Sequence, residues 1–205
     1  MKRIVAGLVV GMGLVLGAAV GAAPVAKHAM KTTAKASPVF TLTSSAFKDD
    51  GIAARKFTCN NKANPNCFGE NISPPLAWHN PPPGTKSFAL VMHDPEGRAP
   101  TGVEHMVIYG IPASVTHFDE GALSAPSPEF VGGRSTMNVG VYTGPGTPPG
   151  TDWHHYTLTI IATDLDPKAL PPGLTHDELA KALGFGPTGH VKGSAGLIMR
   201  WRHPR

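Results

Sequence analysis

The pattern of apolar and polar positions predicts a domain built mainly from β-strands. Several short runs alternate or stay apolar and are rich in β-branched residues, which is typical of half-buried and buried strands. These runs cover residues 39–43, 87–93, 105–111, 156–163 and 195–201. Between them, residues 60–84, 121–134 and 144–150 are rich in Gly, Pro, Asn and Ser. Because these residues favour turns, the long connections are predicted to be ordered loops.

A single helix is predicted near the C-terminal end of the chain. Thr175 and Glu178 have the spacing of a capping box, Leu179 and Leu183 lie on one apolar side, and Gly184 ends the pattern. No internal repeat is visible. The fold class expected is therefore mainly β: a sandwich of two antiparallel sheets with few short helices and long loops. Long connections are uncommon unless they have a function, so candidate site residues are sought there.

The N-terminal residues have the pattern of a secretory signal peptide. Lys2 and Arg3 precede an apolar run over residues 4–20, and small residues follow it. We therefore expect a leader over residues 1–22 and a periplasmic or secreted protein. An uncleaved membrane anchor is the alternative, and it would be the only expected membrane contact. Residues 23–37 are small, polar and basic and are interpreted as a flexible linker, so the folded domain is expected over residues 38–205.

Charge counts argue against a nucleic-acid partner. The whole chain has 18 Lys and Arg against 14 Asp and Glu, with a pI of about 9.2. Five of the basic residues and none of the acidic ones precede Ser37, which leaves 13 basic and 14 acidic residues in the rest. Nucleic-acid binding needs a basic face on the folded domain itself, and this count offers little for one.

The two cysteines, Cys59 and Cys67, are expected to form a disulfide. An exported protein folds in an oxidising compartment, where paired thiols are the rule. A zinc site is the alternative, but seven residues separate the cysteines and no histidine lies near them in the sequence.

A first group of candidate residues follows the apolar run that ends at His93. Asp94 and Glu96 flank Pro95, which restricts the backbone and limits how the two carboxylates are presented. His105 begins the next predicted strand. One strand end and the next strand start can therefore bring these side chains to one rim of a sheet. A plain turn followed by a packed histidine is the structural alternative.

A second group lies in the segment GPGTPPGTDWHHY, residues 144–156. Its prolines and glycines constrain the approach to His154, which begins another predicted strand. If the two strands are neighbours, His154 shares a rim with His105 and the carboxylates. This combination allows three interpretations: a metal site, acid–base catalysis, or a pocket in which imidazoles and backbone N–H groups hold an anion.

Two common catalytic patterns are absent from the sequence. It contains no HExxH spacing of a metalloenzyme and no Gly-x-Ser-x-Gly nucleophile elbow. We therefore expect no metal, no cofactor and no catalytic residue.

Five motifs occur in a fixed order along the chain. They are GENISPPLAW from Gly69, KSFALVMHDPE from Lys86, EHMVIYGIP from Glu104, YTGPGTPPG from Tyr142 and HHY from His154. With these motifs the chain resembles the phosphatidylethanolamine-binding proteins, and specifically their bacterial Raf-kinase-inhibitor-like branch. The resemblance extends from about Pro38 to Arg202. Each motif alone is a weak match, but five in order are specific.

The resemblance implies a β-sandwich with a small pocket at one end that binds anions, such as the phosphate of a phosphatidylethanolamine headgroup. It places seven residues in that pocket: Asp94, Glu96, His105, Gly144, Pro145, His154 and Tyr156. Because neighbours in a strand point to opposite faces, His154 and Tyr156 are expected to face the pocket and His155 to face away.

Three departures from the family pattern concern the pocket. Glu96 stands where the family usually has Asp, and Gly97 and Arg98 lengthen the loop after it. Glu104 precedes His105 in place of an aromatic-rich approach, and His155 replaces the usual arginine. These differences bear on pocket size and ligand identity more than on the fold.

The function expected from the sequence is that of an exported, non-enzymatic binding protein for a phosphate-like anion or a phospholipid headgroup. One alternative is a protein-interaction module whose Pro-rich loops inhibit a protease or another partner. The other is a hydrolase or isomerase in which Asp94, Glu96, His105 and His154 act as acid–base groups or metal ligands.

Overall fold

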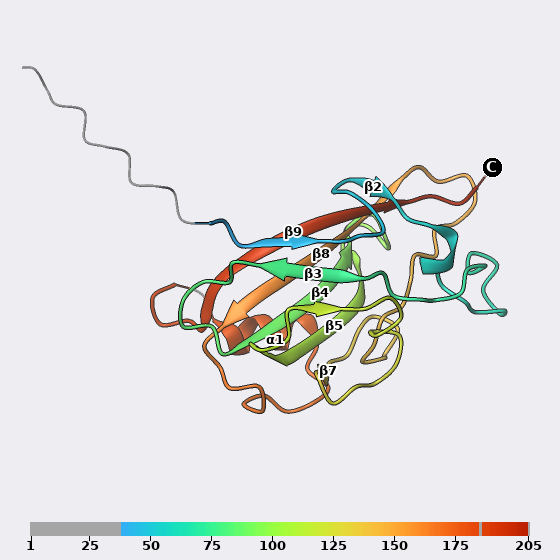
Figure 1. Ribbon diagram of the computed structural model, residues 1–205. Coiled ribbons are helices and arrows are strands. Elements are labelled where there is room, and N and C mark those ends of the chain that lie inside the picture. The colour runs from blue at the N-terminus through green and yellow to red at the C-terminus, as the bar shows by residue number, and fades with distance from the viewer. Residues whose placement is uncertain (1–37, 185, 205) are drawn as a thin grey trace, which may run out of the picture. The chain divides into compact units, whose positions relative to one another are not determined.

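The computed structural model describes residues 38–184 and 186–204 (Figure 1). The predicted leader and linker, residues 1–22 and 23–37, lie outside the described residues, and their boundaries stay predictions. Within the described part of the chain, no helix is long and apolar enough to cross a membrane.

All five strands expected from the apolar pattern are present, with some ends moved by a few residues. They are β1 (Thr41–Thr43), β4 (Ser87–Asp94), β5 (Val103–Pro112), β8 (His154–Thr163) and β9 (Val191–Trp201). Further elements did not stand out in the sequence because each spans four residues or fewer. They are β2 (Gly51–Ile52), β3 (Leu76–His79), β6 (His117–Phe118), β7 (Val131–Gly132) and one turn of 3-10 helix at Arg55–Phe57.

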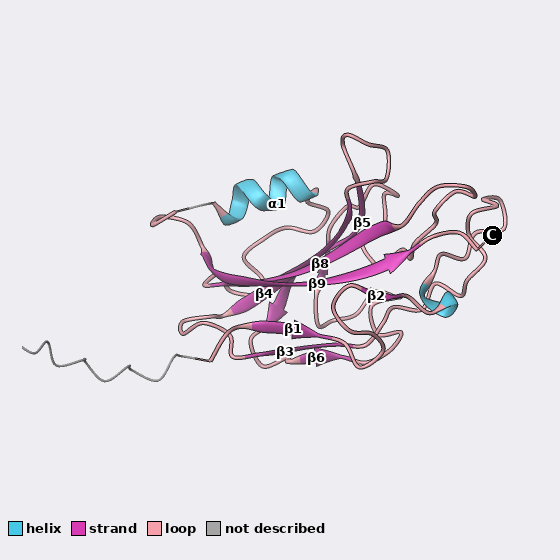
Figure 2. Ribbon diagram, turned by 90° about the horizontal axis from the view of Figure 1, so that it is seen from above, coloured by secondary structure: helices cyan, strands magenta, loops and turns pink. Residues whose placement is uncertain are grey.

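The strands form two sheets, as the sequence predicted. The smaller sheet has the order β1-β3-β6, and the larger has the order β2-β9-β8-β4-β5-β7. Figure 2 shows the smaller sheet on one side of the larger one and the helix α1 (His176–Leu183) on the other. All pairs are antiparallel except that of β2 with β9, which is parallel.

The alternation of side chains along β4 divides the core into two parts. Phe88, Leu90 and Met92 face the smaller sheet and belong to the main core. Ala89 and Val91 point the other way, into a second cluster closed by α1. We call these the inner face and the helix face of the larger sheet. Because both faces are covered, β4 is apolar along most of its length rather than alternating.

The helix has the capping residues that the sequence indicated. The Thr175 hydroxyl accepts a hydrogen bond from the Glu178 N–H, and the Glu178 carboxylate accepts one from the Thr175 N–H, so the capping box is complete. Leu179 and Leu183 are its buried residues and pack on the helix face of the larger sheet. Gly184 caps the C-terminal end with a positive φ of 61°.

One irregularity in the larger sheet decides how the site is built. The register of β4 against β5 shifts by one residue, so that His105 has no partner between Glu104 and Met106. A bulge of this kind re-aims the extra side chain. His105 consequently lies on the inner face, with its ring centre 5.0 Å from that of Tyr156.

Candidate functional site

A cavity of about 630 Å³ lies at the end of β4 and the starts of β5 and β8. Six of the seven predicted site residues line it: Asp94, Glu96, His105, Gly144, His154 and Tyr156. Pro145 does not line it. Its carbonyl instead accepts a hydrogen bond from the Cys59 N–H, 2.9 Å away, and so holds the wall from behind.

The Asp94 carboxylate is buried at the base of the cavity, with its side chain only 4% exposed. Oδ1 accepts the N–H groups of Glu96 and Gly97, at 3.0 and 2.9 Å. Oδ2 lies 2.8 Å from Nδ1 of His154 and 3.9 Å from Nε2 of His105. The buried charge therefore has hydrogen-bond donors at both oxygens, which a buried carboxylate requires.

His154 and Tyr156 follow the alternation expected for β8, and both line the cavity. Since the Asp94 carboxylate can only accept, Nδ1 of His154 carries the proton in their hydrogen bond. The Tyr156 hydroxyl is 3.0 Å from the Thr147 hydroxyl. Burial raises the pKa of Tyr156 above its ordinary value, and the nearby Asp94 charge adds to the shift. The phenol therefore stays protonated at neutral pH.

The His105 ring is neutral and donates a hydrogen bond to a backbone carbonyl. Its Nδ1–H donates to the Thr143 carbonyl at 2.8 Å, and its side chain is 8% exposed. Burial lowers the pKa of His105, and this effect outweighs the Thr143 carbonyl and the Asp94 charge, which favour the protonated form. In the neutral ring, Nε2 is the nitrogen that can accept a hydrogen bond.

Glu96 lies at the rim and is bound to the strand that leads into the cavity. Its carboxylate accepts the backbone N–H of His155 at 3.0 Å and lies 2.9 Å from Nδ1 of the same residue. Burial raises the pKa of Glu96, but the hydrogen bonds from His155 outweigh it and the pKa lies below its ordinary value. His155 itself does not line the cavity, in agreement with the expected alternation.

The wall opposite β4 depends on Asn71, which is not among the predicted site residues. Its Oδ1 accepts the Gly144 N–H at 2.8 Å, and its Nδ2 donates to the Tyr142 carbonyl at 3.3 Å. A Cβ on Gly144 would lie 2.1 Å from the Phe57 carbonyl oxygen, so only glycine fits there. Asn71 belongs to the motif that begins at Gly69, but nothing in that motif indicates that its side chain reaches Gly144.

The disulfide expected between Cys59 and Cys67 is present, and it borders the cavity. A Cβ on Gly146 would come within 2.7 Å of the Cys59 sulfur, so the disulfide packs directly on the Gly-Pro-rich wall. The loop that it closes brings Asn60, Asn61 and Asn64 to the mouth of the cavity. These amides are not among the predicted site residues either.

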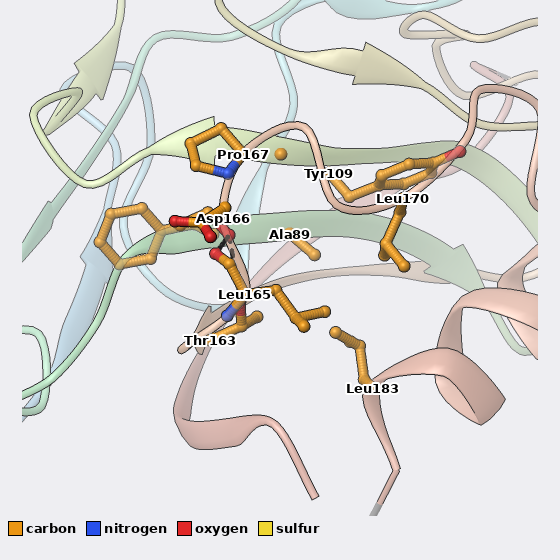
Figure 3. Close-up of a pocket in the computed structure, with 11 residues that line it drawn as sticks. Ala89, Tyr109, Thr163, Leu165, Asp166, Pro167, Leu170 and Leu183 are labelled. Carbon is orange, nitrogen blue, oxygen red and sulfur yellow. Dashed lines mark hydrogen bonds between the residues drawn. The ribbon is translucent and has the colours of Figure 1, made fainter.

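A second hollow, on the helix face, is shown in Figure 3. It lies where Ala89 and Tyr109 of the larger sheet meet Leu165, Leu170 and Leu183. Its volume of about 10 Å³ is at the lower limit for a single water. We regard it as a packing gap in the second core and place the functional site in the larger cavity.

The larger cavity is lined by ionisable and polar side chains. In the described part of the chain there is no group of three or more His, Cys, Asp or Glu placed to hold a metal ion. Neither is there a free cysteine among those residues. The cavity presents two imidazoles next to a buried carboxylate, whereas the N–H groups of Gly97 and Gly144 in its wall already donate to Asp94 and Asn71. Within the described residues, Nε2 of each imidazole has no hydrogen-bond partner and is free to contact a ligand.

Comparisons with known proteins agree with this fold. The model of a family described as "Phosphatidylethanolamine-binding protein" matches residues 43–200. A UPF0098 protein of Methanothermobacter thermautotrophicus is 35% identical over 161 residues, covering 77% of this chain and 95% of that protein. A UPF0098 protein of Aquifex aeolicus is 36% identical over 118 residues, covering 55% of this chain and 66% of the relative.

Two solved structures share the fold. The crystal structure of Escherichia coli YbcL, described as a new member of the mammalian PEBP family, matches with a TM-score of 0.69 and 24% identity. It covers 80% of this chain and 99% of its own. A putative phosphatidylethanolamine-binding protein homologue of Chlamydia trachomatis matches with a TM-score of 0.65 and 27% identity, over 80% of this chain and 98% of its own.

Proposed function

We propose that this chain, which belongs to the phosphatidylethanolamine-binding protein family, is an exported, non-enzymatic binding protein whose pocket takes a phosphate-like anion. The phosphate could be free or part of a phospholipid headgroup, since the chemistry recognised is the same. Family membership supports a binding role. The anion and the export are proposals that rest on this chain's own residues.

The observation that carries the proposal is the placement of His154. Asp94 fixes the ring through Nδ1, and Nε2 makes no hydrogen bond to the protein within residues 38–184 and 186–204. When protonated, His154 offers Nε2–H to a ligand in the cavity while the Asp94 carboxylate balances the charge. Neutral His105 beside it can accept from a phosphate oxygen that retains a proton.

The lining residues also support binding over covalent catalysis. The cysteines at the cavity are joined in a disulfide. Among the hydroxyl groups of the lining, Tyr156 has a raised pKa and Thr151 already donates to the Pro148 carbonyl. None of these hydroxyls is paired with a histidine in the described residues, so none has the base that activates a nucleophile.

The proposal is tested by calorimetry with inorganic phosphate and phosphoethanolamine, using the parent chain and a matched pair of histidine variants. We expect His154→Gln to weaken binding by about tenfold or more, since a hydrogen bond to a charged group contributes ~1.5–3 kcal/mol. The neighbouring change His155→Gln should have a much smaller effect, because His155 is outside the cavity lining. Absence of binding by the parent, or equal loss in both variants, would overturn the proposal.

Export is tested separately by sequencing the N-terminus of protein recovered from its native host. A mature chain that begins at Ala23 and is found outside the cytoplasm is the expected result. A chain that retains Met1, or one found only in the cytoplasmic fraction, would contradict export with cleavage.

A further inference from the structure

The lining of the pocket includes further hydrogen-bond donors that make no hydrogen bond to Asp94 or His154 in the described residues. Asn61 and Asn64 line it from the loop closed by the disulfide, and Arg98 lines it from the connection between β4 and β5. Arg98 lies in a segment far from the two asparagines in the sequence, so the fold has brought the two segments to one cavity.

The two asparagine side chains are oriented by the turns in which they sit. Oδ1 of Asn61 accepts the Ala63 N–H, and Oδ1 of Asn64 accepts the Asn66 N–H, both at 3.0 Å. Only the oxygen of an amide can accept from a backbone N–H, so this assignment is forced. The Nδ2 amino groups are left as donors, and they make no hydrogen bond to the described part of the protein.

The Arg98 guanidinium adds a positive charge that nearby carboxylates do not neutralise. In the described residues Arg98 takes part in hydrogen bonding only through its backbone carbonyl, which accepts from Thr101. Asp94 is engaged with its own turn and with His154, and Glu96 is engaged with His155. An uncompensated cation and two amide donors on the lining of one cavity suit an anionic, acceptor-rich group.

We propose that Asn61, Asn64 and Arg98 form a second subsite, so that the ligand is a phosphomonoester carrying a second anionic group such as a carboxylate. This inference rests on the proposed function, because it assumes that the phosphate lies at His154. The size of the cavity agrees with it. At ~30 Å³ for each water in the liquid, a cavity of about 630 Å³ leaves most of its space empty around one phosphate.

The subsite is tested with two pairs of ligands that differ only at the far end. 3-Phosphoglycerate and glycerol 3-phosphate form the short pair, and 6-phosphogluconate and sorbitol 6-phosphate form the long pair. In each pair a carboxylate replaces a hydroxymethyl group while the phosphate is unchanged. In at least one of the two pairs, we expect the carboxylate ligand to bind about five- to tenfold more tightly than its partner. This is the gain expected from charge-assisted hydrogen bonds at a partly solvent-exposed site. Added salt should reduce this preference.

Variants of the subsite can reverse the preference without disturbing the turns. Asn61→Asp and Asn64→Asp keep the Oδ1 acceptors but replace the amino donors by carboxylate oxygen. The preference for the carboxylate ligand should disappear or invert in each. Arg98→Gln should lower it as well. Asn66→Asp adds the same charge to the same loop outside the cavity lining, so it should retain the preference.

The outcomes separate this inference from the proposed function. If inorganic phosphate binds through His154 but both members of each pair bind equally, the subsite is refuted and the anion pocket remains. If the preference exists but the Asn61, Asn64 and Arg98 variants keep it, the subsite is also refuted. If the parent binds no phosphate compound at all, both proposals fail.

Discussion

Asp94 Oδ2 lies 2.8 Å from His154 Nδ1 and joins the last residue of β4 to the first residue of β8. The two side chains are 4% and 13% exposed, so the hydrogen bond is largely shielded from water. The other oxygen of the carboxylate accepts from the turn that follows β4. The Asp94 side chain thus holds the turn, orients the imidazole and supplies the negative charge that balances a protonated ring.

This relationship predicts separate effects of Asp94→Asn on stability and on binding. The amide oxygen can still accept from the turn, but its NH₂ group then faces Nδ1 of His154. We expect a loss of about 1–3 kcal/mol in the free energy of unfolding, the usual cost of disturbing a buried charged hydrogen bond, as measured in urea. Phosphate binding, measured by calorimetry, should weaken by about tenfold or more, because the counter-charge of His154 is gone. Unchanged phosphate affinity would show that Asp94 has only a structural role.

A second prediction concerns the close contact at Gly144. A Cβ there would come within 2.1 Å of the Phe57 carbonyl oxygen, and backbone cannot move away cheaply. We expect Gly144→Ala to lower the free energy of unfolding by about 2–3 kcal/mol and to weaken phosphate binding as the wall shifts. Gly196→Ala is the matched control, because the nearest atom to its Cβ would be 3.8 Å away. Equal stability of the two variants in urea would contradict the close packing of this wall.

The sequence predicted the strands and the inward direction of His154 because these follow from periodicity. The apolar pattern of β8 alternates, so it determines which side chains of that strand point inward, whereas β4 is apolar on both faces and its pattern indicates only a buried strand. His105 is different. Simple alternation would put it on the helix face with Val107, and only the one-residue bulge turns it into the pocket. No local pattern marks that bulge. The expectation that His105 lies at the rim came from its position at the start of a strand and from the resemblance to the family, not from periodicity.

The parts of the site that the sequence did not predict depend on contacts between distant loops. Asn71 holds Gly144 across 73 positions of the chain, and the disulfide packs on Gly146. The position of Pro145 is a related case, since it supports the wall through its carbonyl without reaching the cavity. Loop packing of this kind has no period along the chain, which is why the sequence did not place Asn61, Asn64 and Arg98 on the cavity lining.

Removal of the disulfide should affect the pocket as well as stability. Replacement of both Cys59 and Cys67 by Ser is expected to lower the free energy of unfolding by about 2–3 kcal/mol, the chain-entropy value for so short a loop. Phosphate binding should weaken too, because the Cys59 N–H holds the Pro145 carbonyl and the sulfur packs on Gly146. Urea unfolding and calorimetry on the double variant measure these effects. Destabilisation with unaltered phosphate affinity would mean that the wall keeps its shape without the cross-link.

The free energy of unfolding should depend on pH because His105 is buried. Burial lowers the pKa of this imidazole in the folded chain, whereas the unfolded chain has the ordinary histidine value of about 6.5. Above that pH both states are neutral, and the full stability is present. As the pH falls below it, the unfolded chain binds a proton that the folded chain does not. The free energy of unfolding therefore decreases, by up to about 1.4 kcal/mol per pH unit, until the folded ring is also protonated.

His105→Asn isolates this contribution, because the asparagine amide can still donate to the Thr143 carbonyl but does not titrate. The variant loses packing against Tyr156, which lowers its stability at every pH by a constant amount. Its free energy of unfolding, measured in urea between pH 7.5 and pH 5, should fall less steeply with decreasing pH than that of the parent. The two slopes should differ by up to about 1.4 kcal/mol per pH unit, the contribution of one titrating group. Parallel curves for parent and variant would mean that His105 gains its proton equally easily in both states. Its burial would then exert no net penalty on the charged ring, and the neutral acceptor assigned to the pocket would have to be reconsidered.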